Sequence, residues 1–356
     1  MREAPKDGRT RFENERTQPI RPRTVFNNPD IVTQAWYPTI PSADLPVGAT
    51  TSVLITRQRI VLWRGEDGEV RALDAFCQHM GADLSNGRVV GNHIQCYFHQ
   101  WSYNRAGELV DIPCVKTLPK RVKTHAWPVE EKFGFIWVYS APEAPYPVPS
   151  PPGLEQAQTS HWYLGRRRLF AHHHAMMAGG IDVQHFASVH GLDIDFDLEI
   201  TRHHDEVADW NLEGAMPHDG WRARLGRFLL GDRFGYTARF AGGSIVTLAY
   251  GPNQRWRGTG SPLPPLYIYW GCTALESGVS DVDIFLVQRR SPGIFGWIRA
   301  QWLMLLTVVL LGVLKDDDVK AFPFMRFAPN KLAPEDKSVV DFMKFIEGLQ
   351  PSHWGG

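Results

Sequence analysis

The sequence predicts an α+β protein of two domains, the first built of strands alone and the second of strands and helices. The chain has 356 residues, more than one hydrophobic core usually holds. Six prolines fall within residues 141–155, and proline-rich segments form stiff, extended connectors. We therefore expect an N-terminal arm (1–33), a β domain (34–140), a linker (141–155) and a second domain (156–356).

Short strands separated by turns account for the first domain. Residues 51–73 have the pattern of two or three strands, with a hairpin turn at residues 66–68. A second hairpin is predicted around residues 105–107, and residues 133–140 have the aromatic and β-branched composition typical of a strand.

The second domain mixes the two kinds of element. Strands are predicted over residues 161–174, 221–230, 235–250, 265–275 and 281–290, and helices over residues 176–190, 294–316 and 335–349.

One segment, residues 302–314, is apolar without interruption. Its thirteen residues fall short of the roughly 20 that a spanning helix needs, and Arg299 limits extension upstream. We expect a helix buried in the core or against another subunit. The alternative is a helix that lies on a membrane surface or lines an apolar substrate entrance.

Charge and cysteine content restrict the kind of partner and compartment. Lys plus Arg and Asp plus Glu both number 38, so the formal net charge is zero, which argues against a nucleic-acid partner. The first 23 residues are charged throughout and contain no apolar signal segment. With only four cysteines in a chain of this size, a disulfide framework is not expected. We predict a reducing, cytoplasmic location.

Two cysteines and two histidines stand in a mirrored pattern in the first domain. Cys77 and His79 are separated by one residue, Cys96 and His99 by two, and sixteen residues lie between His79 and Cys96. Zinc could bind two thiolates and two imidazoles. A Rieske [2Fe–2S] cluster fits better, because one of its irons takes two thiolates and the other two imidazoles. Each Cys–His turn then gives one ligand to each iron.

The stretches "CQHMGADLSNG" and "CYFHQWSY" resemble the Rieske domain of ring-hydroxylating oxygenases. Respiratory Rieske proteins have a disulfide beside the cluster, but Ala82 and Phe98 occupy the equivalent positions here. The resemblance therefore implies a cluster without that disulfide, with fewer hydrogen bonds to sulfur and a lower potential.

A second candidate metal motif, Asp182, His185 and His190, lies in "GGIDVQHFASVHGLD". On a continuous helix, His190 would be displaced from His185 by about 140°. The two histidines can bind one metal only if the helix ends or bulges between them. Two histidines and a carboxylate form the facial triad of non-haem Fe(II) oxygenases.

This motif resembles the mononuclear-iron motif of the same oxygenases. The resemblance implies that His185 and His190 bind iron, while Asp182 bridges His185 to a cluster ligand, matching His99, of an adjacent subunit. That family often has an Asn just before the motif, where Gly179 stands here.

The third iron ligand should be a carboxylate far downstream. The resemblance favours Asp318, followed by Val, Lys, Ala and Phe, with Asp317 as the second choice. Asp316 and the remaining acid would cap a helix end. The triplet of histidines at 172–174 is predicted to lie on a strand edge, where successive side chains point to opposite faces and cannot bind one ion.

The resemblance covers residues 32–345 and implies a catalytic second domain with a curved antiparallel sheet of helix-grip type. It further implies a homotrimer in which each cluster serves the next subunit's iron. Electrons would come from NAD(P)H through a separate ferredoxin or flavin reductase, since no dinucleotide motif is present.

The predicted reaction is mono-oxygenation, that is, hydroxylation, demethylation or desaturation, of a bulky hydrophobic substrate such as a steroid by O2. One alternative is N-oxygenation or oxidative cyclisation of an arylamine or nitrogen heterocycle. A second alternative, from another class, is a Rieske protein that only transfers electrons.

Overall fold

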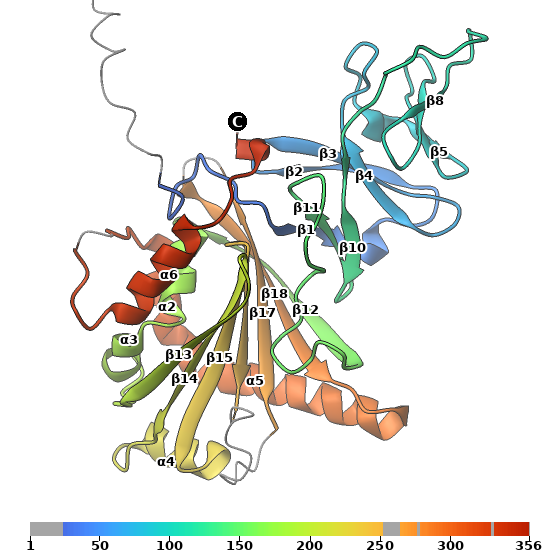
Figure 1. The fold of residues 1–356 in the computed structure, drawn as a ribbon. Helices are drawn as coiled ribbons and strands as arrows, with labels where there is room; N and C mark the ends of the chain where they lie inside the picture. The colour runs from blue at the N-terminus through green and yellow to red at the C-terminus, as the bar shows by residue number, and fades with distance from the viewer. Residues whose placement is uncertain (1–23, 252–263, 276–277, 329–330, 356) are drawn as a thin grey trace, which may run out of the picture.

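The computed structural model describes residues 24–251, 264–275, 278–328 and 331–355. Three small antiparallel sheets make up the N-terminal domain, which lies at the upper right of Figure 1. The first sheet comprises β1 (Trp36–Pro41), β11 (Phe135–Tyr139) and β10 (Val129–Lys132). The second comprises β2 (Thr50–Ile55), β3 (Gln58–Arg64), β4 (Val70–Asp74) and β9 (Ala126–Trp127). The third comprises β5 (Arg88–Val90), β6 (His93–Gln95), β7 (Ser102–Tyr103) and β8 (Leu109–Asp111).

A seven-stranded antiparallel sheet forms the second domain (Figure 1). In spatial order its strands are β12 (Thr159–Leu169), β18 (Ser280–Arg289), β17 (Leu266–Ala274), β16 (Ile245–Tyr250), β15 (Arg233–Ala241), β14 (Val207–Ala215) and β13 (Phe196–His204). The sheet therefore confirms the predicted α+β class with a large antiparallel sheet in the second domain.

The two faces of this sheet pack against different partners. One face meets the N-terminal domain through an aromatic core in which Trp137 contacts Tyr269 and Phe285. The other face packs against helices. The helices of the domain are α2 (His173–Gly179), α3 (Val183–Ser188), α4 (Trp221–Leu230), α5 (Gly293–Ala321) and α6 (Lys337–Glu347).

Several predicted elements differ in the structure. Residues 221–230 form helix α4 rather than a strand. Trp, Arg, Ala and Leu are all acceptable in helices. Gly220 and Gly231, with φ of 90° and 94°, flank the helix.

The predicted helix over residues 176–190 is two short helices, α2 and α3, with a break at residues 180–182. Residues 235–250 form the hairpin β15–β16, which turns at Gly242 and Gly243. Strands β13 and β14 were not predicted, although Phe196, Leu198 and Ile200 alternate with polar residues as a half-buried strand requires.

Helix α5 is longer and more exposed than the buried helix predicted at residues 302–314. It runs over 29 residues, and its window Gly293–Gly312 has a mean hydropathy of 1.8 with only 28% of the window buried. By length and composition alone this helix could cross a membrane. The single chain does not bury α5 in its core, because the helix packs on the sheet through one face only; burial against another subunit stays a prediction.

Each end of the described chain packs against the domain that is farther from it in the sequence. The backbone N–H groups of Val25 and Phe26 donate to the carboxylate of Glu347 on α6, at 2.9 and 3.0 Å. In the opposite direction, Trp354 packs against Trp127 in the core of the N-terminal domain, with ring centroids 5.0 Å apart. Val25 and Phe26 thus belong to the core of the second domain, and Trp354 to that of the first.

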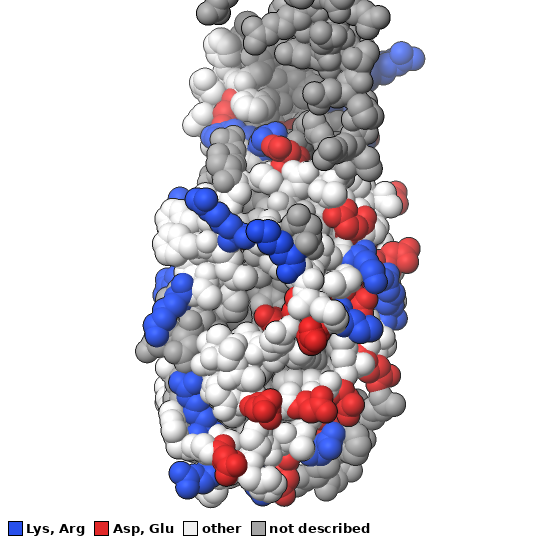
Figure 2. Space-filling view, turned by 90° about the vertical axis from the view of Figure 1, so that its left-hand side faces the viewer, with Lys and Arg blue, Asp and Glu red and all other residues white. Residues whose placement is uncertain are grey.

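Charge is spread evenly over the face that Figure 2 presents. Acidic and basic side chains alternate there, as the formal net charge of zero leads one to expect. Such a surface differs from the single-sign basic face that nucleic-acid-binding domains present.

Candidate metal centres

Two loops of matching geometry carry the cysteine–histidine motif. In the first, the N–H of Gly81 donates to the carbonyl of Cys77 at 2.9 Å. In the second, the N–H of Gln100 donates to the carbonyl of Cys96 at 3.0 Å. Gly81 and Gln100 are both left-handed, with φ of 72° and 58°. The same turn is therefore built twice, and each copy presents one cysteine and one histidine.

Burial separates the two kinds of ligand. Cys77 and Cys96 are 4% and 2% exposed, whereas His79 and His99 are exposed. The two imidazole rings lie 4.5 Å apart between centroids. Buried thiols beneath two adjacent exposed imidazoles fit a [2Fe–2S] cluster whose thiolate-bound iron is inside and whose imidazole-bound iron is at the surface.

Tyr103 and Trp101 complete this centre, and neither was singled out from the sequence. The Tyr103 hydroxyl lies 3.2 Å from Cys77 Sγ and accepts a hydrogen bond from the Gln78 N–H. Burial raises the pKa of Tyr103, so the hydroxyl keeps its proton and can donate it to a thiolate sulfur. Tyr103 thus offers one hydrogen bond to sulfur, and the expectation of fewer such bonds than in respiratory Rieske proteins stays a prediction. The Trp101 ring stacks on His79 with centroids 4.4 Å apart and fixes the orientation of that imidazole.

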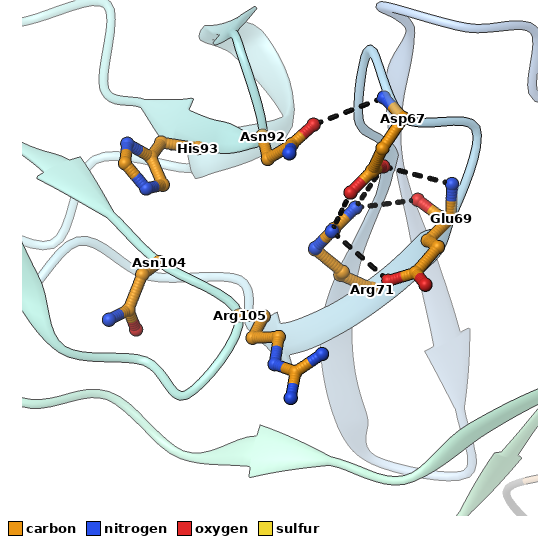
Figure 3. A pocket seen from close by; sticks show the side chains of 7 residues that line it. All are labelled: Asp67, Glu69, Arg71, Asn92, His93, Asn104 and Arg105. Atoms are coloured by element: carbon orange, nitrogen blue, oxygen red, sulfur yellow. Dashed lines mark hydrogen bonds and ion pairs between the residues drawn. The ribbon is translucent and has the colours of Figure 1, made fainter.

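A polar hollow of about 410 Å³ opens elsewhere on the N-terminal domain (Figure 3). Arg71, only 7% exposed, forms ion pairs there with Asp67 and Glu69. The hydrogen bond from Arg71 lowers the pKa of Asp67 to about 2. The ion pairs of Arg71 stabilise the hairpin that borders this hollow, and Arg105 also lines it.

Helix α3 organises the second motif. Asp182 is its N-cap, and its side chain accepts a hydrogen bond from the Gln184 N–H at 2.9 Å. The main-chain carbonyl of Asp182 also accepts a hydrogen bond from His185 Nδ1. Because a carbonyl can only accept, Nδ1 carries the proton and the lone pair of Nε2 is available for a metal.

His190 meets His185 because the helix ends between them. Helix α3 stops at Ser188, so the condition set by the five-residue spacing is met. The two rings lie 5.1 Å apart between centroids, with His190 buried and His185 partly exposed. Arg222 of α4 donates to the His190 carbonyl at 3.0 Å and holds the loop in place.

Asp318 lies on α5, but the side chains of residues 313–319 fall outside the described part of the structure. A contact one turn further on shows where this end of α5 lies. A Cβ built on Gly179 of α2 would stand 2.3 Å from the ring of Phe322. Gly179, three residues before Asp182, is therefore in close contact with Phe322, which lies one helical turn after Asp318.

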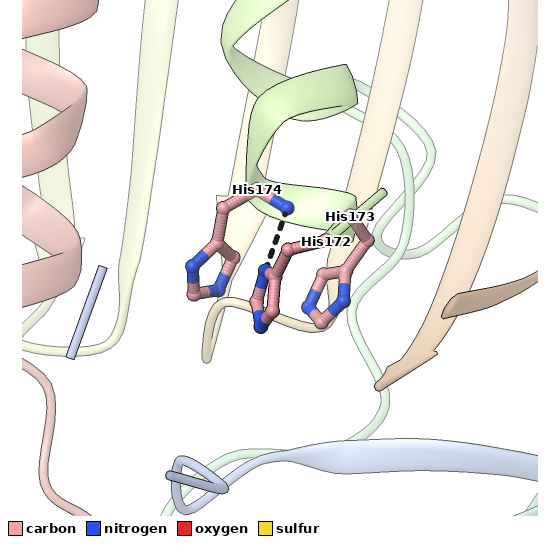
Figure 4. A group of neighbouring side chains, drawn as sticks. All are labelled: His172, His173 and His174. Atoms are coloured by element: carbon pink, nitrogen blue, oxygen red, sulfur yellow. Dashed lines mark hydrogen bonds between the residues drawn. The ribbon is translucent and has the colours of Figure 1, made fainter. Parts of the chain in front are cut away.

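The histidine triplet is a helix start rather than the predicted strand edge (Figure 4). His172 is the N-cap of α2, and β12 ends three residues earlier, at Leu169. The ligand atoms of His172, His173 and His174 lie within 4.8 Å of one another, all buried. On a helix start, successive side chains do not point to opposite faces as they do on a strand. Whether the triplet can bind one ion therefore depends on the hydrogen bonds of its ring nitrogens.

Those hydrogen bonds fix the tautomers in a way that opposes metal binding. His172 Nδ1 accepts from the His174 N–H at 3.2 Å, and His174 Nδ1 accepts from the Asn27 N–H at 3.0 Å. His173 Nε2 donates to the Gly243 carbonyl at 2.9 Å. Burial lowers the pKa of all three imidazoles, that of His173 to about 4. Each neutral ring thus carries its proton on Nε2 and uses Nδ1 as an acceptor, so the triplet ties α2 to its neighbours.

An aromatic wall stands beside His185 and His190. Phe186 packs against Phe196 and Tyr236 at 5.1 and 5.6 Å between centroids, and the wall continues through Tyr250. Further along the sheet, Trp270 and Ile284 are paired in the middle of two interior strands but keep partial exposure. Apolar side chains therefore continue along the helix-covered face of the sheet, from the histidine pair towards its centre.

Comparison with known proteins gives the first domain its family. Residues 35–125 match the model of the Rieske [2Fe-2S] domain. The chain carries a Rieske domain. The matched range includes both loops of the cysteine–histidine motif described above.

Curated relatives match parts of the chain. Cholesterol 7-desaturase of Bombyx mori is 34% identical over 189 residues, which cover 49% of this chain and 41% of that protein. The oxygenase component of 3-ketosteroid-9-alpha-monooxygenase from Rhodococcus rhodochrous is 37% identical over 106 residues, covering 29% and 28%. The aligned part thus spans less than half the length of these relatives.

Solved structures match nearly the whole fold. Dicamba monooxygenase bound to dicamba superposes with a TM-score of 0.59 at 18% identity, over 88% of this chain and 96% of that one. Pseudomonas putida NdmB superposes with a TM-score of 0.62 at 17% identity, over 91% and 93%. The Rieske domain and the helix-covered sheet are thus arranged as in Rieske oxygenases.

Proposed function

We propose that this protein is the oxygenase component of a Rieske non-haem iron system that mono-oxygenates a hydrophobic substrate with O2. The observation that carries the proposal is the meeting of His185 and His190 beyond the end of α3, where both rings contact Phe186 of the aromatic wall. A protein that only transfers electrons has no need of a second histidine pair oriented by a carbonyl. The sterol-related names of two relatives support an oxygenase of bulky apolar molecules.

The residues of this chain divide the work between two centres. Cys77, Cys96, His79 and His99 would hold the [2Fe–2S] cluster, and His185, His190 and Asp318 would hold Fe(II). When bound, the cluster supplies single electrons and the mononuclear iron supplies open positions for O2.

Asp182 has a positioning role in this proposal. Its main-chain carbonyl keeps the proton of His185 on Nδ1, so that Nε2 faces the metal. Its carboxylate, partly exposed at the cap of α3, would accept a hydrogen bond from His99 of an adjacent copy and so connect the two centres.

The tip of the Rieske domain has the properties of a docking surface for that adjacent copy. Around the exposed His79 and His99 stand four exposed apolar side chains, those of Phe76, Met80, Tyr97 and Phe98, which are 48 to 67% exposed. A homotrimer in which each tip covers the α3 region of the next copy would bury them. Such a ring closes only if tip and α3 surface are complementary.

The apolar side chains along the helix-covered face of the sheet support a substrate class. Phe196, Tyr236, Tyr250, Trp270 and Ile284 offer aromatic and aliphatic surface with few polar groups, which suits a steroid. An arylamine or nitrogen heterocycle is the second candidate, since flat aromatic rings stack on the same wall. Electrons would come from NAD(P)H through a separate ferredoxin or flavin reductase, and the cytoplasmic location stays a prediction.

Metal analysis and oxygen uptake test the proposal together. The oxygenase should hold three iron atoms per chain, two in the cluster and one in the triad. Steroids should stimulate oxygen uptake with a reductase and NADH, and arylamines should not. Two iron atoms per chain, with no uptake for either panel, would instead identify an electron-transfer protein.

Asp318→Ala should remove one iron atom and abolish turnover while the Rieske absorbance is retained. Asp316→Ala is the matched control on the same helix end and should keep all three iron atoms. Retention of full activity by Asp318→Ala would transfer the ligand role to Asp317.

A further inference from the structure

The outer face of α5 is apolar along most of its described length. Its exposed side chains include Phe295 at 84%, Ile298 at 49%, Trp302 at 56%, Leu305 at 53% and Val309 at 58%. Over this stretch the strip is about 22 Å long at 1.5 Å per residue. An ordinary surface helix shows polar residues on this side, so α5 requires a partner that covers it.

The inner face of α5 fixes the helix to the protein. Ala300, Leu303 and Met304 are buried, and Gln301 accepts a hydrogen bond from the Trp162 indole at 2.6 Å. A helix held along one side by the sheet cannot leave it to cross a bilayer without exposing that core. The partner must therefore approach α5 from outside and lie parallel to it.

The distribution of charge indicates the chemistry of this partner. Between Gly293 and Leu314 the sequence contains one charged residue, Arg299. Arg289 and Arg290, both exposed, precede the helix. Arginines beside tryptophan at the border of an apolar strip are typical of segments that lie in a membrane interface. Interfaces between copies of one chain are also more apolar than the rest of the surface, so the exposed arginines beside the strip, rather than its apolarity, favour an anionic lipid surface over a second copy.

We propose that α5 docks this protein onto an anionic lipid bilayer. The exposed apolar side chains enter the boundary between headgroups and acyl chains, and Arg290 and Arg299 contact lipid phosphates. On its inner side, α5 shares a small core with Trp270 and Ile284, so the docked helix lies between the lipid and the sheet. The docking itself does not depend on the proposed oxygenase activity.

Vesicle co-sedimentation of the cluster-loaded full chain tests this docking. The protein should sediment with vesicles of phosphatidylcholine and phosphatidylglycerol, and more weakly with phosphatidylcholine alone. The double variant Phe295→Glu/Trp302→Glu should lose at least about tenfold in binding to both, because two buried aromatic side chains become charged. Both positions are mostly exposed, and an unchanged Rieske spectrum will show that the variant is folded.

Matched variants separate the lipid from other partners. Leu54→Glu changes an equally exposed side chain, 60%, on the Rieske domain and should bind vesicles like the unaltered chain. Arg290→Gln and Arg299→Gln should each weaken binding to the anionic vesicles by about fivefold and leave binding to phosphatidylcholine unchanged.

Three outcomes would overturn the docking. The unaltered chain could fail to sediment with either vesicle, or the double variant could sediment as well as the unaltered chain. The double variant could also reduce the oligomeric mass in sedimentation velocity without affecting vesicle binding. This last result would assign the strip to contact between copies of the chain.

Discussion

The two candidate metal centres are built in opposite ways. In the Rieske domain, two copies of one turn would supply all four proposed ligands within 23 residues, from Cys77 to His99. In the catalytic domain, His185 and His190 come from the end of a six-residue helix, while Asp318 stands on another helix more than 120 residues later. The first centre depends on local backbone geometry, and the second depends on how distant elements pack.

Breaking the packing of the second centre should give the largest effect. Gly179→Ala places a Cβ 2.3 Å from the Phe322 ring, so α2 and the end of α5 must separate by roughly 1 Å to reach ordinary contact. We expect loss of most of the mononuclear iron and about a 100-fold fall in turnover, with the Rieske spectrum unchanged.

Rescue and control variants make this prediction specific. Phe322→Ala, combined with Gly179→Ala, should restore part of the iron because the obstructing ring is gone. Gly312→Ala, a helical glycine of α5 with no atom within 4 Å of an added Cβ, should keep full iron content. Equal iron loss in Gly312→Ala and Gly179→Ala would disprove the role of the contact.

The connection between the centres should be sensitive to charge at Asp182. Asp182→Asn keeps an N-cap for α3, because Asn caps helices as well as Asp, and leaves the main-chain bond to His185 in place. Single-turnover transfer from the reduced cluster to the mononuclear site should slow by about 10- to 100-fold at unchanged iron content. Asp182→Ala should in addition destabilise α3, which thermal unfolding will detect; unchanged transfer in Asp182→Asn would refute the bridging role.

Acid should weaken the catalytic domain through the histidine triplet. The pKa of His173 is lowered by burial to about 4, below the ordinary value of 6.5, so the unfolded chain binds the proton more tightly. Stability is therefore complete above pH 6.5 and falls as the pH drops towards 4. Protonation of His173 in the unfolded chain should by itself lower the free energy of unfolding by roughly 2 kcal/mol at pH 5.

Chemical denaturation followed by circular dichroism at pH 7.5 and pH 5 measures this loss. His173→Gln can still donate to the Gly243 carbonyl but does not titrate, so it should remove about 2 kcal/mol of the pH dependence. An identical pH dependence in the two proteins would show that other groups govern acid stability.

The smallest effect should distinguish the two loops of the first centre. Gln100 has a φ of 58°, which strains a residue with a side chain, whereas the matched Gly81 does not carry this cost. Gln100→Gly should raise the stability of the cluster loop by up to about 1 kcal/mol. Gly81→Ala should lower this stability by a similar amount. The temperature at which the Rieske absorbance is lost measures both changes. If both variants changed the stability in the same direction, the two loops would not be equivalent.

The same contrast explains which parts could be predicted from sequence. Cys77, His79, Cys96 and His99 are recognised by spacing because the turns that carry them are local. Residues that act through packing, such as Tyr103 on Cys77 or Phe322 on Gly179, give no short-range signal. Helix α4 was mistaken for a strand. It carries apolar side chains on both sides, with Ala223 buried and Trp221 and Leu225 exposed, so it lacks the single apolar face that marks an amphipathic helix.

The crossing of the chain ends has a consequence for how the protein is made. Trp354 completes the core of the Rieske domain, although that domain is otherwise synthesised first. On the ribosome, the N-terminal domain must therefore wait for almost the whole chain before its core closes. A tag fused directly behind Trp354 or a short C-terminal deletion will harm the domain furthest away in sequence, and neither domain should be expressed alone at its apparent boundary.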